Sequence, residues 1–166
     1  MGIKFISNKM DILTKAHKKF LIDLLDANVS FLLIGGYAVN FHGYARYTSD
    51  MDLWLKPDEI NKNNFIEFLR RRNFNAESLE HLQQLDFTIA NAFHIGQAET
   101  KIDFLTKVVG VKYDEANEQK VFLPLGNRQI PVIQYHHLIL SKMSTSRIQD
   151  IADVEQLQNI NKFKKK

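Results

Sequence analysis

Helical and strand-like hydrophobic patterns are mixed along this chain without a regular βαβ repeat, and this mixture restricts the fold more than any other property of the sequence. Residues 10–27 predict an amphipathic helix, because apolar residues recur at spacings of three and four with lysines on the other side. A continuous apolar run at 31–34 stops at Gly35-Gly36, which is typical of a short buried strand. The mixture favours an α+β fold with a mixed or antiparallel sheet flanked by helices.

The rest of the chain continues this alternation of short elements. Pro57, followed by two acidic residues, predicts the start of a helix. Ser146 and Gln149 have the spacing of a capping box, which predicts that the last helix starts after Ser146. Gly126-Asn127 predicts a hairpin between two apolar runs. The other expected elements are a short helix at 37–42 and strands at 51–55, 87–89, 93–95, 102–105, 121–123 and 130–133.

The length of 166 residues predicts one domain, which we place at residues 1–161, followed by a basic tail at 162–166. Formal net charge is +3, but four lysines lie in the last five positions, so the body without them is slightly acidic. The basic character therefore belongs to the tail, which we expect to be a solvated end, and it is weak evidence for nucleic-acid binding by the body.

The chain contains no cysteine, which excludes disulfides, thiolate nucleophiles and cysteine-ligated zinc. No apolar run approaches the roughly 20 residues that a membrane span requires. The apolar stretch at the N-terminus is too short for a secretory signal. We therefore expect a soluble, cytoplasmic protein with no membrane partner.

Asp50 and Asp52 are the first candidate site residues. Residues two apart in a strand point to the same face, so both carboxylates project together. Two carboxylates about 4 Å apart repel by roughly 4 kcal/mol at an effective dielectric constant near 20. A fold keeps such a pair cheaply only if one carboxylate is protonated or a cation lies between them, and oxygen ligands at this spacing suit Mg²⁺.

Asp103 is a candidate third ligand, because it lies in an otherwise apolar predicted strand where an uncompensated charge is costly. If that strand lies beside 51–55, the three carboxylates converge on a metal site for phosphoryl transfer. Gly35-Gly36 allows backbone to approach a phosphate closely, and Arg46 and Thr48 are placed to contact phosphate oxygens.

Each of these features also has an ordinary structural explanation. An Asp-x-Asp pair at a strand edge can be a solvated pair, and Gly-Gly can be a plain turn. Arg147 and Asp150 can form a surface ion pair on one helix, and Lys142 can be a cation near a helix end. Spacings among the histidines do not match a zinc site. The order of the features together is more specific than any one of them.

That order resembles the nucleotidyltransferase superfamily of the DNA polymerase beta type. Its hallmarks are a Gly-Gly or Gly-Ser turn, an Asp-x-Asp strand and a third strand carboxylate. More narrowly, the sequence is similar to the small bacterial group that includes AbiEii-type toxins. This closer resemblance rests on Gly35-Gly36, on Arg46 to Asp52, and on the Lys-x4-Arg element of Lys142 and Arg147, which is followed by the helical aspartates Asp150 and Asp153.

The resemblance, over about Val29 to Leu157, implies an enzyme that moves a nucleoside monophosphate from a nucleoside triphosphate to a hydroxyl on RNA, protein or a small molecule. It implies that Mg²⁺ or Mn²⁺ is held by Asp50, Asp52 and Asp103. The remaining implied roles are phosphate binding by Gly35 and Gly36, triphosphate contact by Lys142 and support of the site by Asp153. The sequence shows no second domain for an acceptor and no base-reading signature.

Two other functions stay open at this point. One is a nucleotide-binding or interaction module without turnover, such as a toxin–antitoxin component with a cognate partner protein. The other is a sugar-nucleotide glycosyltransferase, which also uses Asp-x-Asp with a divalent metal, although such an enzyme predicts a larger chain.

Overall fold

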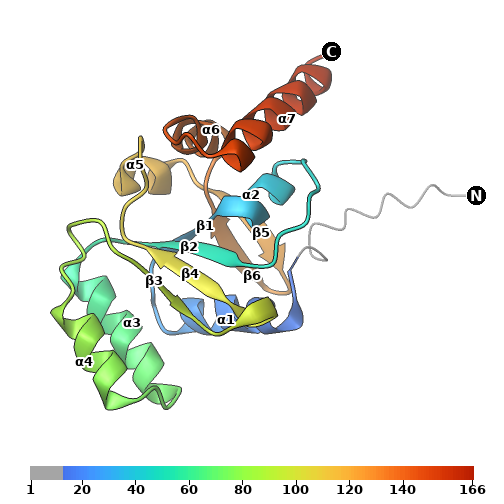
Figure 1. Ribbon diagram of the computed structural model, residues 1–166. Helices are drawn as coiled ribbons and strands as arrows, with labels where there is room; N and C mark the ends of the chain where they lie inside the picture. The colour runs from blue at the N-terminus through green and yellow to red at the C-terminus, as the bar shows by residue number, and fades with distance from the viewer. Residues whose placement is uncertain (1–12) are drawn as a thin grey trace, which may run out of the picture.

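The computed structural model describes residues 13–166 and confirms an α+β fold, with helices around one six-stranded mixed sheet (Figure 1). The strands are β1 (Phe31–Ile34), β2 (Met51–Leu55), β3 (Ala92–Ile95), β4 (Ile102–Leu105), β5 (Val121–Leu125) and β6 (Arg128–Val132). Their order across the sheet is β3-β4-β2-β1-β6-β5. The pairs β2–β4 and β1–β6 are parallel, whereas β1–β2, β3–β4 and β5–β6 are antiparallel.

Helices cover both faces of this sheet. They are α1 (Lys15–Asp26), α2 (Gly35–Phe41), α3 (Glu59–Arg71), α4 (Ala76–Gln84), α5 (Tyr113–Glu118), α6 (Tyr135–Met143) and α7 (Ile148–Lys164), with a short 3-10 turn η2 (Ala98–Thr100). In Figure 1, α1 lies below the sheet, and α2, α6 and α7 lie above it. The site described below lies on the side of α2, α6 and α7.

An aromatic cluster fills the space between α1, α3 and the sheet. Phe65 of α3 has its ring centroid 5.0 Å from that of Phe104 on β4, and Phe20 of α1 contacts both Phe104 and Phe68. Because successive residues of a strand point to opposite faces, burying Phe104 against these helices turns Asp103 to the other face. The core of the molecule thus determines which face of β4 carries the carboxylate.

Capping side chains set the start of several helices. The predicted helix at 10–27 begins at Lys15, because the Thr14 hydroxyl accepts a hydrogen bond of 3.1 Å from the backbone N–H of His17. The part of this prediction at 10–12 lies outside the described residues. Asp58 caps α3 in the same way, accepting from the backbone N–H of Asn61 at 2.7 Å.

The strand predicted at 87–89 is wrong, and these residues form a turn. The carboxylate of Asp86 accepts from the backbone N–H of Thr88 at 2.8 Å and from its hydroxyl at 2.6 Å, a local pattern that competes with strand pairing. Phe87 is nevertheless fully buried, whereas Ile89 is exposed. The apolar pattern here reflects one side chain, Phe87, that fills the core beside Phe93 of β3. The sequence reasoning also missed the preceding helix α4.

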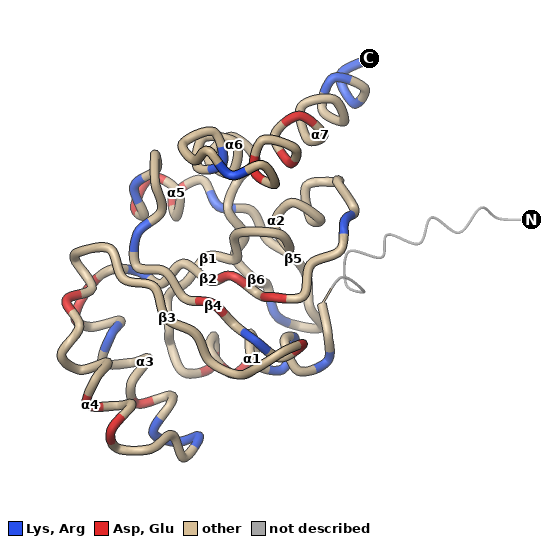
Figure 2. The backbone as a smooth tube through the Cα atoms, in the orientation of Figure 1, with Lys and Arg blue, Asp and Glu red and all other residues tan. Residues whose placement is uncertain are grey.

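The last helix starts after Ser146 as predicted, but the predicted capping box is wrong. Helix α7 begins at Ile148 with Arg147 in the N-cap position, and no side chain caps it. It continues to Lys164, so most of the segment predicted as a basic tail is helical. Figure 2 shows the basic positions that gather at this end of α7.

Replacing Phe65 tests the aromatic cluster. Phe65→Ala removes a fully buried ring and should lower the free energy of unfolding by about 3–5 kcal/mol. Urea denaturation followed by circular dichroism measures this loss. The matched control is Phe163→Ala on the exposed surface of α7, which should change stability by less than about 0.5 kcal/mol. Equal losses in the two variants would contradict the assignment of the core.

Candidate active site

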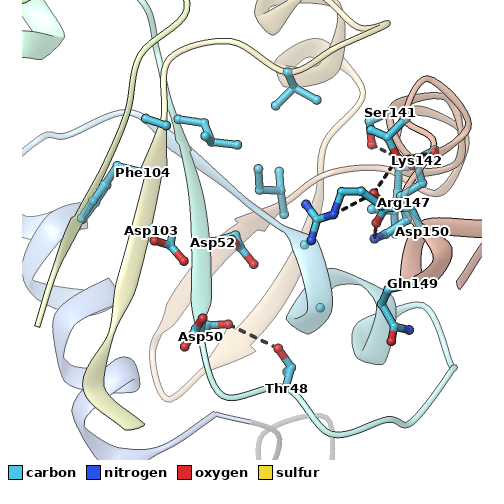
Figure 3. Close-up of a pocket in the computed structure, with 18 of the residues that line it drawn as sticks. Thr48, Asp50, Asp52, Asp103, Phe104, Ser141, Lys142, Arg147, Gln149 and Asp150 are labelled. Atoms are coloured by element: carbon cyan, nitrogen blue, oxygen red, sulfur yellow. Dashed lines mark hydrogen bonds and ion pairs between the residues drawn. The ribbon is translucent and has the colours of Figure 1, made fainter. Parts of the chain in front are cut away.

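Two of the predicted carboxylates lie next to each other on neighbouring strands. Asp52 on β2 is the register partner of Asp103 on β4, and these strands are parallel. Adjacent strands are about 4.8 Å apart and paired residues share a face of the sheet, so both side chains project together. Asp50, directly before β2, lines the same cleft. Figure 3 shows the three carboxylates along one wall.

The cleft beside these carboxylates has a volume of about 870 Å³. Its opposite wall is built from α6 and the start of α7, where Figure 3 shows Lys142, Arg147 and Asp150. One side of the cleft is therefore acidic, and the other carries cationic groups. The residues predicted for the site that line the cleft are Gly35, Gly36, Arg46, Thr48, Asp50, Asp52, Asp103 and Lys142; Asp153 does not line it.

Negative charge is concentrated at Asp52. Burial, and then the neighbouring charges of Asp103 and Asp50, raise the pKa of Asp52 to about 6. The positive charges of Lys142 and Arg147 act in the opposite direction but do not cancel the effect. A carboxylate in such surroundings is stabilised in its ionised form by any additional cation that enters the cleft.

A lysine already lies against two of the three carboxylates. The ammonium Nζ of Lys101 is 3.1 Å from Oδ1 of Asp103 and 3.6 Å from Oδ2 of Asp50. Its hydrogen bond to Asp103 raises the pKa of Lys101. Sequence reasoning missed Lys101, although its position two residues before Asp103 on an extended segment places both side chains on one face.

The chemistry of the donors fits a divalent metal ion. Hard carboxylate oxygens from three side chains are typical ligands of Mg²⁺ and Mn²⁺. Within residues 13–166, no three His, Cys, Asp or Glu side chains already surround a common point as metal ligands do. In the arrangement described here, the cation nearest to Asp50 and Asp103 is the ammonium of Lys101.

The glycine pair packs directly against the acidic segment. Gly35 has φ of +65°, a conformation that favours glycine, and a Cβ atom there would collide with the carboxylate of Asp52. A Cβ atom on Gly36 would collide with the hydroxyl of Thr48. Both glycines therefore keep the backbone of the turn in contact with the Arg-x-Thr-x-Asp-x-Asp segment.

A buried ion network ties α6 and α7 to this segment. The guanidinium of Arg46 binds Asp153 through two hydrogen bonds, at 2.7 Å from Nε and 2.9 Å from its second terminal nitrogen. Lys142 Nζ lies 2.7 Å from Asp150 and 2.8 Å from Asp153. Burial by itself raises the pKa of Asp153, but the hydrogen bonds from Arg46 and Lys142 outweigh it and hold the pKa below its usual range. The cations predicted to meet phosphate are thus engaged with aspartates of α7.

Two further residues that the sequence reasoning did not assign to the site line the cleft. Arg147 has 77% of its side chain exposed and lies 3.7 Å from Asp150, so its predicted pairing with that residue leaves most of the guanidinium accessible. His94 on β3 is the register partner of Asp103 and is exposed. Strand register is a long-range property, so no local spacing around His94 signals this position.

The chain is similar to the crystal structure of an antigenic nucleotidyltransferase-like protein from Paracoccidioides brasiliensis, with 14% sequence identity and a TM-score of 0.49. The match covers 92% of this chain and 75% of that chain. No protein-family model and no curated protein matches the sequence. Within the described part of the chain, every helix is too short or too polar to span a bilayer.

The raised pKa of Asp52 predicts a pH-dependent stability difference. Since its pKa is higher in the folded protein than in the unfolded chain, Asp52 destabilises the fold as pH rises from about 4 through 6. In metal-free buffer, Asp52→Asn should be more stable than the original chain at pH 7.5 by about 1–3 kcal/mol, because it removes this penalty. The difference should shrink toward zero at pH 4. Urea denaturation across this range measures it, and a pH-independent difference would contradict the assignment.

Breaking the buried network should be costly. Asp153→Asn leaves Arg46 without its carboxylate partner and Lys142 with only one. We expect a loss of about 3–5 kcal/mol in the free energy of unfolding, because unpaired charges stay buried. The control is Glu115→Gln, which removes an exposed pair with Lys112 at 3.9 Å and should cost less than about 1 kcal/mol. A loss in Asp153→Asn as small as in the control would show that the network is not a structural anchor.

Proposed function

We propose that this chain is a nucleotidyltransferase that transfers a nucleoside monophosphate from a nucleoside triphosphate to a hydroxyl acceptor. The observation that carries the proposal is the register pairing of Asp52 with Asp103, with Asp50 beside them, along one wall of a cleft. Three carboxylates facing a cleft whose opposite wall is cationic suit a substrate that brings both phosphate and a divalent cation.

In this proposal, the three carboxylates bind the metal ion, and one of them also accepts the proton of the acceptor hydroxyl. Asp50, Asp52 and Asp103 would hold Mg²⁺ or Mn²⁺, which when bound offsets charge on the phosphate oxygens and lowers the pKa of an acceptor hydroxyl. The acceptor oxygen forms a bond to the α-phosphorus, and the bond from that phosphorus to the oxygen bridging the β-phosphate breaks. Pyrophosphate leaves with the electron pair, and Asp103 takes the proton of the hydroxyl.

The opposite wall binds the triphosphate in this proposal. Arg147 presents an accessible guanidinium, which suits bidentate contact with phosphate. Lys142 uses two of its three N–H donors on aspartates and keeps one for the substrate. Arg46 positions this wall through Asp153.

The turn beside Asp52 would complete the phosphate site. Gly35 and Gly36 bring backbone close to the phosphates, and the hydroxyl of Thr48 lies beside Gly36 at the rim. The acceptor would approach over β3, where His94 stands beside Asp103.

Transfer of labelled nucleotide tests the function. The full chain is incubated with each α-phosphate-labelled nucleoside triphosphate and Mg²⁺ or Mn²⁺, alone and with added RNA or cell extract, and label is followed on protein, RNA and small molecules. We expect transfer that falls at least about 100-fold in Asp52→Asn, because charge at the reacting phosphate is no longer compensated. The control Asp26→Asn, on the half-exposed end of α1, should keep the activity.

Two outcomes would reject the proposal. Equal label in the original chain and in Asp52→Asn would exclude the assigned carboxylates. Binding of nucleotide and Mg²⁺ in calorimetry with no labelled product from any acceptor would instead support a module that binds nucleotide without turnover, such as a component of a toxin–antitoxin pair.

A further inference from the structure

Lys101 has a place in the site that the transfer reaction does not require. Its ammonium group bridges carboxylates from two strands, since Asp103 belongs to β4 and Asp50 directly precedes β2. Asp52 has no hydrogen-bond or ion-pair contact to Lys101 among those of the described residues. Lys101 thus compensates the negative charges of Asp50 and Asp103, whereas Asp52 has no direct contact with this ammonium and is repelled by both carboxylates.

A divalent ion bound to both Asp50 and Asp103 would lie close to this ammonium group. A cation that shares oxygens of Asp50 and Asp103 has to lie between them, and Nζ of Lys101 lies within 3.6 Å of both. Two cations in one place repel strongly, so the ammonium and a metal ion exclude each other. A divalent ion also neutralises more of the charge at Asp52 than a single ammonium does.

The side chain of Lys101 is able to leave. About a third of it is exposed, and its carboxylate partners are 29% and 40% exposed for Asp103 and Asp50. Exposed ion pairs contribute little to stability because water competes for both charges. A lysine on a flexible four-carbon stem can therefore swing away without disturbing the strand that carries it.

We propose that Lys101 is the internal counter-cation of the three-carboxylate site, and that a divalent ion binds there by displacing its ammonium group. This inference rests on the proposed function in one respect, namely that these carboxylates bind a divalent ion. It adds that the affinity for the ion is set by competition with a side chain of the same protein. Lys101 thereby keeps the site compact without metal and lowers its affinity for free metal ions.

The binding of Mn²⁺ to the full chain tests the inference without any nucleotide or turnover. Free Mn²⁺ is measured by electron paramagnetic resonance at low ionic strength and pH 7.5. Lys101→Met keeps most of the stem and removes the charge, and it should bind Mn²⁺ at least about tenfold more tightly than the original chain. Lys101→Arg keeps the charge and should stay within about threefold of the original chain.

The matched control is Lys107→Met, which removes an exposed lysine that lines the same cleft. It should alter the affinity by less than about threefold, because the ion pairs of Asp50 and Asp103 among the described residues are made by Lys101 and not by Lys107. Equal affinity of Lys101→Met and the original chain would overturn the role of Lys101 while leaving the metal site intact. If the original chain, Lys101→Met and Lys101→Arg all fail to bind Mn²⁺, the metal site of the proposed function is overturned, and this inference with it.

Chemical modification of lysine amines gives a second readout that needs no variant of Lys101. Limited acetylation followed by mass spectrometry reports how accessible each amine is. Saturating Mg²⁺ should increase acetylation of Lys101 at least about threefold relative to Lys107 in the original chain, because the released ammonium leaves its carboxylates. The increase should be absent in Asp52→Asn. Unchanged acetylation of Lys101 in a chain that binds metal would show that the side chain is not displaced.

Discussion

Asp50, Asp52 and Asp103 repel one another, and the rest of the site has to compensate for this repulsion. Parallel pairing of β2 with β4 holds Asp52 and Asp103 side by side, and burial of Asp52 strengthens the repulsion by excluding water. The fold tolerates this because hydrophobic packing on the other face fixes β4, with Phe104 fully buried against α1 and α3. Stability gained in the core thus maintains an arrangement that electrostatics alone would not keep.

The Lys and Arg side chains around the three carboxylates fall into a buried group and an exposed group. Arg46 and Lys142 are fixed by buried aspartates of α7, so their contribution is to build the opposite wall of the cleft. Lys101 and Arg147 are partly or largely exposed, so water competes for their ion pairs. The division follows from burial, because a buried ion pair that loses one partner leaves an uncompensated charge, whereas an exposed pair exchanges with water.

The parts of the structure that depend on local sequence were predictable, and those that depend on long-range pairing were not. The Gly-Gly stop after β1 and the shared face of Asp50 and Asp52 follow from neighbouring residues. The turn at 87–89 was mistaken for a strand because its apolar residues look the same whether they pair or only fill the core. The contact between Arg46 and Asp153 spans 107 positions, and no spacing rule reaches so far.

The anchoring of α7 by Arg46 and Lys142 has a consequence for the order in which the site can form during synthesis. Asp153 follows β2 and β4 in the chain, so a nascent chain that has already formed these strands still lacks the wall opposite its carboxylates until α7 is made. Until α7 leaves the ribosome, Arg46 and Lys142 lack their buried partner Asp153 and one wall of the cleft is missing. With the elements in this order, the two walls of the site cannot both be present before α7 has been translated.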